Sequence, residues 1–352
     1  MTDEIFFAEK NGWGIIALDR PKALNALTRG MITAFHKQLT LWAVDSSIHA
    51  VMIKGAGDRA FCAGGDIRWL HDTAKEDPAL ASEFFREEYI NNVAIYHFPK
   101  PFVALIDGIV MGGGVGVSVH GDFRVAGDNT LFAMPETGIG LFPDVGGGHF
   151  MPRLEDGLGL YYALTGARAK AADCVASGIA THYTPTDQFG ALESDLLAAE
   201  IENDASSIIN SVLDKHNVHP GRADIDDVRP AISSFFAKAE SLEQLLDAFQ
   251  KDDSEFAVKI LEVLSRMSPT SMAITFEQMK RGKSLSFNEV MQMEFRIVCR
   301  ILEGKDFFEG VRAQILDKDR NPQWVPSRLI DVSEEDVLNY FENLGGSELI
   351  LN

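Results

Sequence analysis

A glycine-rich segment followed by two carboxylates is the part of the chain with the clearest chemistry. An apolar run at residues 102–106 predicts a buried strand, and Gly112, Gly113 and Gly114 then open a predicted helix. Glycine has no Cβ, so the unpaired N–H groups at the start of this helix are accessible to a ligand. Such donors stabilise the oxyanion that develops when a carbonyl group is attacked. The segment therefore indicates acyl chemistry.

Glu136 and Asp144 are the candidate acid–base groups. Each follows a proline, Pro135 or Pro143, so both carboxylates lie on turns with a restricted backbone. Glu136 could act as the base that activates water, or as a nucleophile that forms a mixed anhydride with the acyl group. Each residue also has a structural alternative. Glu136 could be a helix or turn cap, and Asp144 could be the N-cap of a helix that starts near Val145.

These residues, together with residues 60–68, resemble the crotonase superfamily of enoyl-CoA hydratases and isomerases. The resemblance is closer to one branch, the 3-hydroxyisobutyryl-CoA hydrolases. The segments that carry it are spread over most of the chain: residues 84–89, 112–121, 132–137, 142–148, 305–313 and 317–319.

The resemblance implies a role for each candidate residue. The backbone N–H groups of Gly65 and Gly113 would form the oxyanion hole. Glu136 and Asp144 would bind the hydroxyacyl end of the substrate and carry out hydrolysis, and Glu88 would contact the substrate. Without the resemblance, Glu88 would be assigned to a solvated helix face. Several carboxylates in one pocket would raise the pKa of at least one of them.

Coenzyme A would enter as part of the substrate, with no separate cofactor and no metal. We expect Lys22, Asp66, Ile67 and Arg68 to contact this substrate. Cations such as Lys22, Arg68 and Lys54 can serve the phosphates of coenzyme A. The alternative is that each of them is a solvated surface cation.

Three other functional motifs are incomplete in this sequence. The sequence around Ser118 is similar to a nucleophile-elbow motif, but it lacks the closing glycine of that motif. We also expect Ser118 to lie inside the predicted helix. Val117 occupies the last glycine position that a dinucleotide-binding fingerprint requires. His149 and His182 have no neighbouring ligands at metal spacing, so we expect structural histidines.

The composition limits the partners and the compartment. The chain has 352 residues, of which 46% are hydrophobic, and its formal net charge of −20 argues against nucleic-acid and anionic-membrane partners. Three scattered cysteines are too few for a disulfide framework. The N-terminal residues have neither a secretion-signal nor a transit-peptide pattern, which predicts a cytoplasmic location. The resemblance leaves a homo-oligomer open, because relatives often form trimers or hexamers.

Alternating short strands and helices predict an α/β fold for the first part of the chain. A helix is expected at residues 28–44, and strands at residues 13–18, 50–54, 102–106, 123–126 and 131–133. The resemblance implies that these units wind as the ββα superhelix of crotonases.

From residue 187 onward the apolar residues recur at helical spacing. This predicts a loop at residues 216–229 and helices at residues 189–210, 231–249, 255–267, 269–280 and 287–302. We therefore divide the chain into residues 1–200, a crotonase-like acyl-CoA-binding catalytic core, and residues 201–352, a mainly helical C-terminal region.

The leading interpretation is an acyl-CoA thioester hydrolase that converts 3-hydroxyisobutyryl-CoA and water to 3-hydroxyisobutyrate and coenzyme A, a step of valine breakdown. The alternatives are an enoyl-CoA hydratase or isomerase on the same fold and a non-catalytic acyl-CoA-binding subunit. Hydratases of the family carry a second catalytic glutamate two residues beyond the glycine triplet, where this chain has Gly116. Hydration needs two carboxylates that share one water, so Gly116 favours the hydrolase, although Glu88 or Asp144 could supply the second carboxylate.

We predict that the protein releases thiol from a hydroxyacyl-CoA faster than it hydrates crotonyl-CoA, because Gly116 supplies no second carboxylate. A thiol reagent measures hydrolysis, and the loss of enoyl absorbance measures hydration. A binding subunit would give neither signal. Thioester cleavage in this scheme does not require a glutamate at position 116. Hydration as fast as thiol release would reverse the order of the two enzymatic interpretations.

Overall fold

Residues 3–351 are described by the computed structural model, and the chain divides into two units. The strand unit comprises the chain up to Gly65 together with Ile90–Phe132 and Arg168–Asp226. The helical unit comprises Asp66–Tyr89, Ala133–Ala167 and the chain from Asp227 onward. Each unit is assembled from segments that are far apart in the sequence. The predicted division at residue 200 stays a prediction.

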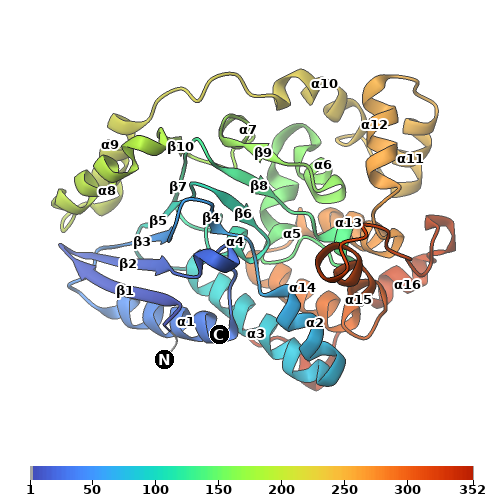
Figure 1. The fold of residues 1–352 in the computed structure, drawn as a ribbon, viewed down its shortest axis with the longest axis horizontal. Coiled ribbons are helices and arrows are strands. Elements are labelled where there is room, and N and C mark those ends of the chain that lie inside the picture. The colour runs from blue at the N-terminus through green and yellow to red at the C-terminus, as the bar shows by residue number, and fades with distance from the viewer. Residues whose placement is uncertain (1–2, 352) are drawn as a thin grey trace. The chain divides into compact units, whose positions relative to one another are not determined.

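A six-stranded sheet forms the first layer of the strand unit (Figure 1). Its order is β1-β2-β3-β5-β7-β10, with β1 antiparallel to β2 and the other neighbours parallel. The strands are β1 Ile5–Lys10, β2 Trp13–Leu18, β3 Ala50–Gly55, β5 Phe102–Leu105, β7 Phe123–Ala126 and β10 His182–Tyr183. Strand β5 is buried along its whole length, as expected for a parallel strand inside a sheet.

A second sheet has the order β4-β6-β8-β9. It consists of β4 Ala60–Cys62, β6 Ile109–Met111, β8 Leu131–Ala133 and β9 Ala169–Lys170. From β3 to β8, successive strands alternate between the two sheets, and helices separate the strand pairs. This alternation is the repeated ββα unit that the family resemblance implied. The expected α/β class is confirmed.

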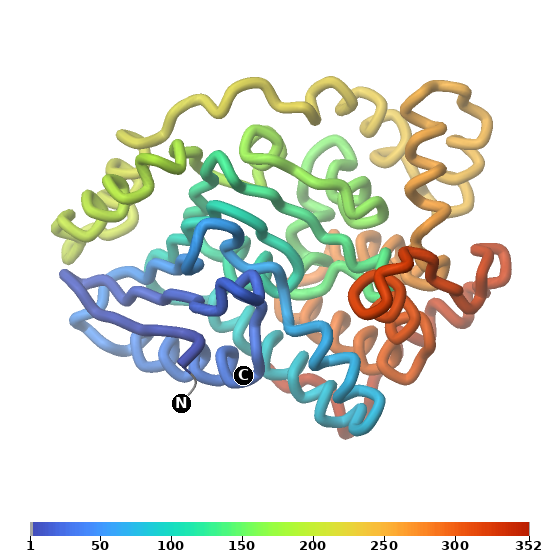
Figure 2. The backbone as a smooth tube through the Cα atoms, in the orientation of Figure 1, coloured from blue at the N-terminus to red at the C-terminus, as the bar shows by residue number. Residues whose placement is uncertain are grey.

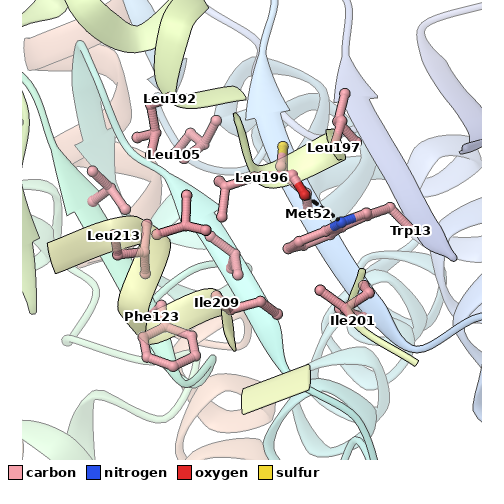
Figure 3. Close-up of a cluster of buried hydrophobic side chains, with 14 residues drawn as sticks. Trp13, Met52, Leu105, Phe123, Leu192, Leu196, Leu197, Ile201, Ile209 and Leu213 are labelled. Carbon is pink, nitrogen blue, oxygen red and sulfur yellow. Dashed lines mark hydrogen bonds between the residues drawn. The ribbon is translucent and has the colours of Figure 1, made fainter. Parts of the chain in front are cut away.

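The core of the strand unit lies between the six-stranded sheet and a helical hairpin. Helices α8 (Phe189–Ala198) and α9 (Ala205–His216) run side by side as one hairpin (Figure 2). Their apolar side chains meet Trp13, Met52 and Phe123 of the sheet (Figure 3). The indole N–H of Trp13 donates to the carbonyl oxygen of Leu196 at 2.9 Å, so its polar atom is satisfied inside this core.

Helices dominate the helical unit, as predicted for the C-terminal region. They are α2 Ile67–Glu76, α5 Gly147–Phe150, α6 Leu158–Thr165, α11 Leu242–Gln250, α12 Glu255–Leu264, α13 Pro269–Gly282, α14 Phe287–Ile301, α15 Asp306–Val311 and α16 Glu334–Asn339. Two further helices, α3 (Pro78–Tyr96) and α10 (Ile225–Phe235), have residues in both units. Within residues 3–351, no helix has the length and apolarity required to cross a membrane.

Most of the predicted elements are confirmed, with small shifts at their ends. Helix α1 spans Arg29–Val44, and Thr28 caps it by accepting a hydrogen bond from the N–H of Met31. Helix α13 begins at Pro269 after the cap Ser268, as the proline suggested.

Other expectations about the helices are wrong. The predicted helix at 189–210 is interrupted between α8 and α9, because Asp204 caps a new helix. The predicted helix at 231–249 is likewise interrupted, because Ser241 caps α11. Arg229 lies inside α10, so the predicted loop ends earlier than residue 229. The glycine-led helix α4 (Gly113–Gly116) is a single turn, and Ser118 follows it.

Candidate active site

Two glycine segments approach each other in the strand unit. Gly64 follows β4 and has φ of +114°, while Gly112 precedes α4 with φ of +47°, and both conformations favour glycine. A Cβ on Gly64 would lie 3.6 Å from the backbone nitrogen of Gly113. A Cβ on Gly114 would lie 2.1 Å from the carbonyl oxygen of Cys62, so α4 contacts the end of β4 directly. The two segments that the sequence singled out are therefore neighbours.

The N–H groups of Gly65 and Gly113 are free in the described part of the chain, where neither donates to an acceptor. Two later donors in α4 are already used, since the N–H groups of Val115 and Gly116 both bond to the carbonyl of Gly112, at 2.7 and 3.2 Å. Gly113 is the first residue of α4, where a helix leaves its N–H unpaired. Both glycines thus have a donor to offer to a ligand oxygen.

Four carboxyl groups of the helical unit are almost completely buried. Glu88, Glu136, Asp144 and Glu294 expose 3%, 5%, 4% and 0% of their surface. Across residues 3–351, none of them forms an ion pair with Lys, Arg or His. The phenol of Tyr89 donates to Asp144 Oδ2 at 2.8 Å. Asp144 is thus held by a neutral hydrogen bond and not by a cation.

Burial raises the pKa of all four groups, because the charged form loses its hydration. It raises the pKa of Asp144 from 3.8 to about 7 and the pKa of Glu294 from 4.5 to about 8. The pKa values of Glu88 and Glu136 rise well above 4.5, first through burial and then through the negative charge of Asp144. The expected crowding of carboxylates is therefore present, although burial is the larger cause.

Two carboxyl oxygens in this cluster have no partner in the structure. Glu136 Oε2 and Glu88 Oε1 are buried and meet no hydrogen-bond donor or acceptor among the described residues. A buried polar atom without a partner is costly, and such atoms commonly serve water or a ligand. These oxygens are the open acceptors of the cluster.

The capping alternatives for the two carboxylates are wrong. Helix α5 begins at Gly147 after Gly146 and has no side-chain cap, and the carboxyl group of Asp144 bonds to Tyr89 instead. Glu136 is the first residue of a short 3-10 helix, Glu136–Ile139, which also has no side-chain cap. Neither carboxyl group is used to hold a helix end.

Glu294 and Tyr89 belong to this cluster, and the sequence analysis missed both. Glu294 lies on the buried face of α14, beside Met291 and Val298. A lone glutamate within the apolar stripe of an amphipathic helix was a usable signal. Tyr89 directly follows Glu88 but carried no signal of its own.

Asp66, Ile67, Arg68 and Lys22 are the other residues that the sequence analysis predicted to contact the substrate. Asp66 caps α2 and accepts a hydrogen bond from the N–H of Trp69 at 3.2 Å, with Ile67 as the first helical residue. Arg68 and Lys22 are exposed. Their contact with substrate stays a prediction. Lys54 instead pairs with Glu193 at 2.5 Å, so its charge is already engaged.

The described residues contain no cluster of three or more His, Cys, Asp and Glu side chains that could hold a metal ion. His149 packs its ring edgewise on Phe287, with 5.3 Å between ring centres. His182 packs on the ring of Phe123 at 6.0 Å. Both histidines contact aromatic side chains in the fold.

Comparison with known sequences gives a consistent result. The enoyl-CoA hydratase/isomerase family matches residues 13–341. A mitochondrial 3-hydroxyisobutyryl-CoA hydrolase from Xenopus tropicalis is 51% identical, covering 96% of this chain and 88% of the relative. The human mitochondrial 3-hydroxyisobutyryl-CoA hydrolase is 46% identical, covering 99% and 91%. The predicted cytoplasmic location is contradicted, because these relatives are named as mitochondrial proteins.

Solved structures resemble the chain over nearly its full length. A carnitinyl-CoA dehydratase from Mycobacterium thermoresistibile has a TM-score of 0.92 and 36% identity, covering 99% of each chain. An enoyl-CoA hydratase from Rhodobacter sphaeroides has a TM-score of 0.90 and 34% identity, covering 99% of this chain and 100% of that one.

The buried carboxyl groups make stability depend on pH in a defined direction. Because the folded-state pKa of Asp144 is about 7 against an ordinary 3.8, the native state keeps a proton that the unfolded chain releases. The stabilisation is complete below the ordinary value and is lost as the pH rises through about 7. We predict that the melting temperature falls from about pH 5 to about pH 8, and that Asp144→Asn reduces this fall.

Thermal melts at several pH values measure this effect. Asp252→Asn is the control, because hydrogen bonds from Ser254 lower the pKa of the partly exposed Asp252, so that this residue takes up no proton in this range. An equal slope in wild type and Asp144→Asn would show that Asp144 is already charged in the native state.

Proposed function

Because the chain belongs to the enoyl-CoA hydratase/isomerase family, we propose that it is the acyl-CoA thioester hydrolase that cleaves 3-hydroxyisobutyryl-CoA to 3-hydroxyisobutyrate and coenzyme A. The observation that carries this proposal is the 51% identity to a hydrolase of that name, over 96% of the chain. The crotonase-type α/β fold with its C-terminal helices is that of the family. The reaction is a step of valine breakdown.

The thioester carbonyl is the electrophile, and its oxygen becomes negative when a nucleophile adds. In the proposed mechanism the free N–H groups of Gly65 and Gly113 stabilise this oxyanion. Backbone donors suit this role, because they need no change of charge during the reaction. Loss of one such donor costs about 3 to 4 kcal/mol of transition-state stabilisation.

Glu136 is the proposed reacting carboxyl group. Acting as a base, it removes a proton from water while the water oxygen attacks the carbonyl carbon, and it then gives that proton to the departing coenzyme A sulfur. Acting as a nucleophile, it forms a mixed anhydride, expels the thiolate and is released by water. Either course requires the ionised form of Glu136. Its raised pKa makes that form a stronger base than an ordinary carboxylate.

Asp144 and Glu88 are proposed to bind the hydroxyl group of the acyl chain. The open Oε1 of Glu88 can accept the hydroxyl proton. Asp144 keeps one carboxyl oxygen on Tyr89 at 2.8 Å, which fixes the direction of the other. The mechanism uses no cofactor and no metal, since coenzyme A is part of the substrate. A homo-oligomer stays a prediction.

A hydratase or isomerase is the second candidate, and the names of the two solved structures favour it. Their identity to this chain, 36% and 34%, is lower than the 51% to the hydrolase. Gly116 lies buried at the end of α4 and supplies no carboxylate there. The hydrolase therefore remains the better supported of the two.

We predict that Glu136→Gln lowers kcat for thiol release by at least about a hundredfold, because the amide cannot take a proton or form an anhydride. Binding of acyl-CoA and the melting temperature are expected to change little. Asp144→Asn should also lose activity while folding normally. Glu155→Gln, on an exposed residue of the same unit, is the matched control. Near-normal hydrolysis by Glu136→Gln would remove Glu136 from the mechanism.

The oxyanion hole is tested by Gly113→Pro, which deletes the N–H at the first position of α4. Proline is compatible with this helical position, so the fold is expected to survive. We expect kcat to fall about a hundredfold or more. Gly113→Ala retains the N–H and shows the effect of the added Cβ alone. If the folded proline variant kept its activity, the oxyanion would have to bind elsewhere.

A further inference from the structure

The loop that carries Asp144 is held by a carboxyl group from a distant helix. Glu294 of α14 accepts the N–H of Gly146 at 2.7 Å through Oε2 and the N–H of Gly148 at 2.8 Å through Oε1. Its side chain is fully buried. Both carboxyl oxygens are therefore used on the backbone directly after Asp144.

A second side chain holds the other side of Asp144. Gln278 of α13 donates through Nε2 to the carbonyl oxygen of Pro143 at 2.8 Å. The same Nε2 donates to Glu294 Oε1 at 3.0 Å. Gln278 and Glu294 thus form one hydrogen-bonded pair, and this pair also hydrogen-bonds to the backbone both before and after Asp144.

The glycines of this loop fit the pair closely. A Cβ on Gly148 would lie 2.9 Å from Gln278 Nε2 and 3.0 Å from Glu294 Oε1. A Cβ on Gly282 of α13 would lie 1.8 Å from the carbonyl oxygen of Gly148. The close fit explains why glycine stands at position 148, because a side chain there would displace the pair.

The backbone segment held by these hydrogen bonds is strained. Val145, between Asp144 and Gly146, has φ of +50°, a left-handed conformation that is rare for a β-branched residue. Such strain persists only where the surroundings over-determine it, and it is found preferentially at functional sites. The hydrogen bonds from Gln278 and to Glu294 are local restraints that can hold this conformation.

We propose that Glu294, supported by Gln278, is a positioning residue that fixes the Asp144 carboxyl group for thioester hydrolysis. The inference rests on the proposed function and adds a residue to it. Glu294 does not touch the substrate in this scheme. It acts through the backbone of the loop, whose strained segment sets the direction of Asp144.

Glu294→Gln tests the proposal, because glutamine offers one acceptor oxygen where two N–H groups need one each. We expect kcat for thiol release to fall about tenfold to a hundredfold, as misplaced catalytic groups do, while KM changes less than about threefold. A purely structural role predicts a lower melting temperature with the kcat of the folded fraction unchanged. Circular dichroism and thermal melts give the folded fraction.

Two further variants complete the experiment. Glu289→Gln is the matched control on the same helix, because exposed Glu289 only caps α14 through Ser286 and should leave kcat unchanged. Gln278→Met removes the donation to Pro143 at similar side-chain size, and it decides the question if Glu294→Gln does not fold. Folded variants with wild-type kcat would overturn the positioning role. A wild type that releases no thiol would instead overturn the proposed function.

Discussion

The burial of Glu88, Glu136, Asp144 and Glu294 without a cation is the main physical constraint on the helical unit. Taking an ionised carboxylate out of water is costly, so each group must stay protonated or find donors. Glu294 finds two backbone N–H groups and Asp144 finds a phenol. Glu88 and Glu136 each leave one oxygen open in the described structure. The cluster therefore contains two kinds of carboxyl group. One kind is hydrogen-bonded to other protein groups, and the other kind has an oxygen available to a substrate or water.

In the proposed mechanism, the strand unit stabilises the oxyanion with backbone N–H groups alone. Its short helix α4 leaves the N–H of Gly113 unpaired, and the close approach of Cys62 and Gly114 keeps the helix against β4. Backbone amides do not titrate in the working range of an enzyme. In the proposed mechanism, the pH dependence therefore originates in the buried carboxyl groups and not in the oxyanion hole.

Much of this arrangement could be predicted from local sequence, because apolar periodicity and glycine placement are local signals. Five strands (β2, β3, β5, β7 and β8), helices α13 and α14 and the two glycine segments follow from such signals, whereas the remaining strands were not predicted. The pairing of Glu294 with Gly146 joins residues 148 positions apart, and no local pattern encodes that contact. The breaks before α9 and α11 were missed because one cap at Asp204 or Ser241 outweighed a continuous apolar period. The predicted cytoplasmic location was wrong, because the pattern of the N-terminal residues alone does not determine the compartment.

The tight contact between Gly148, Gln278 and Glu294 also constrains how the sequence can drift. A larger residue at 148 would meet both side chains within 3.0 Å, and a shorter residue at 294 would leave two amides unbonded. We therefore expect the effects of changes at these three positions to be coupled, because a residue larger than glycine at 148 needs space that the side chains at 278 and 294 now fill. Although Gly148 is distant from the other two residues along the chain, all three form one packed unit around the loop of Asp144.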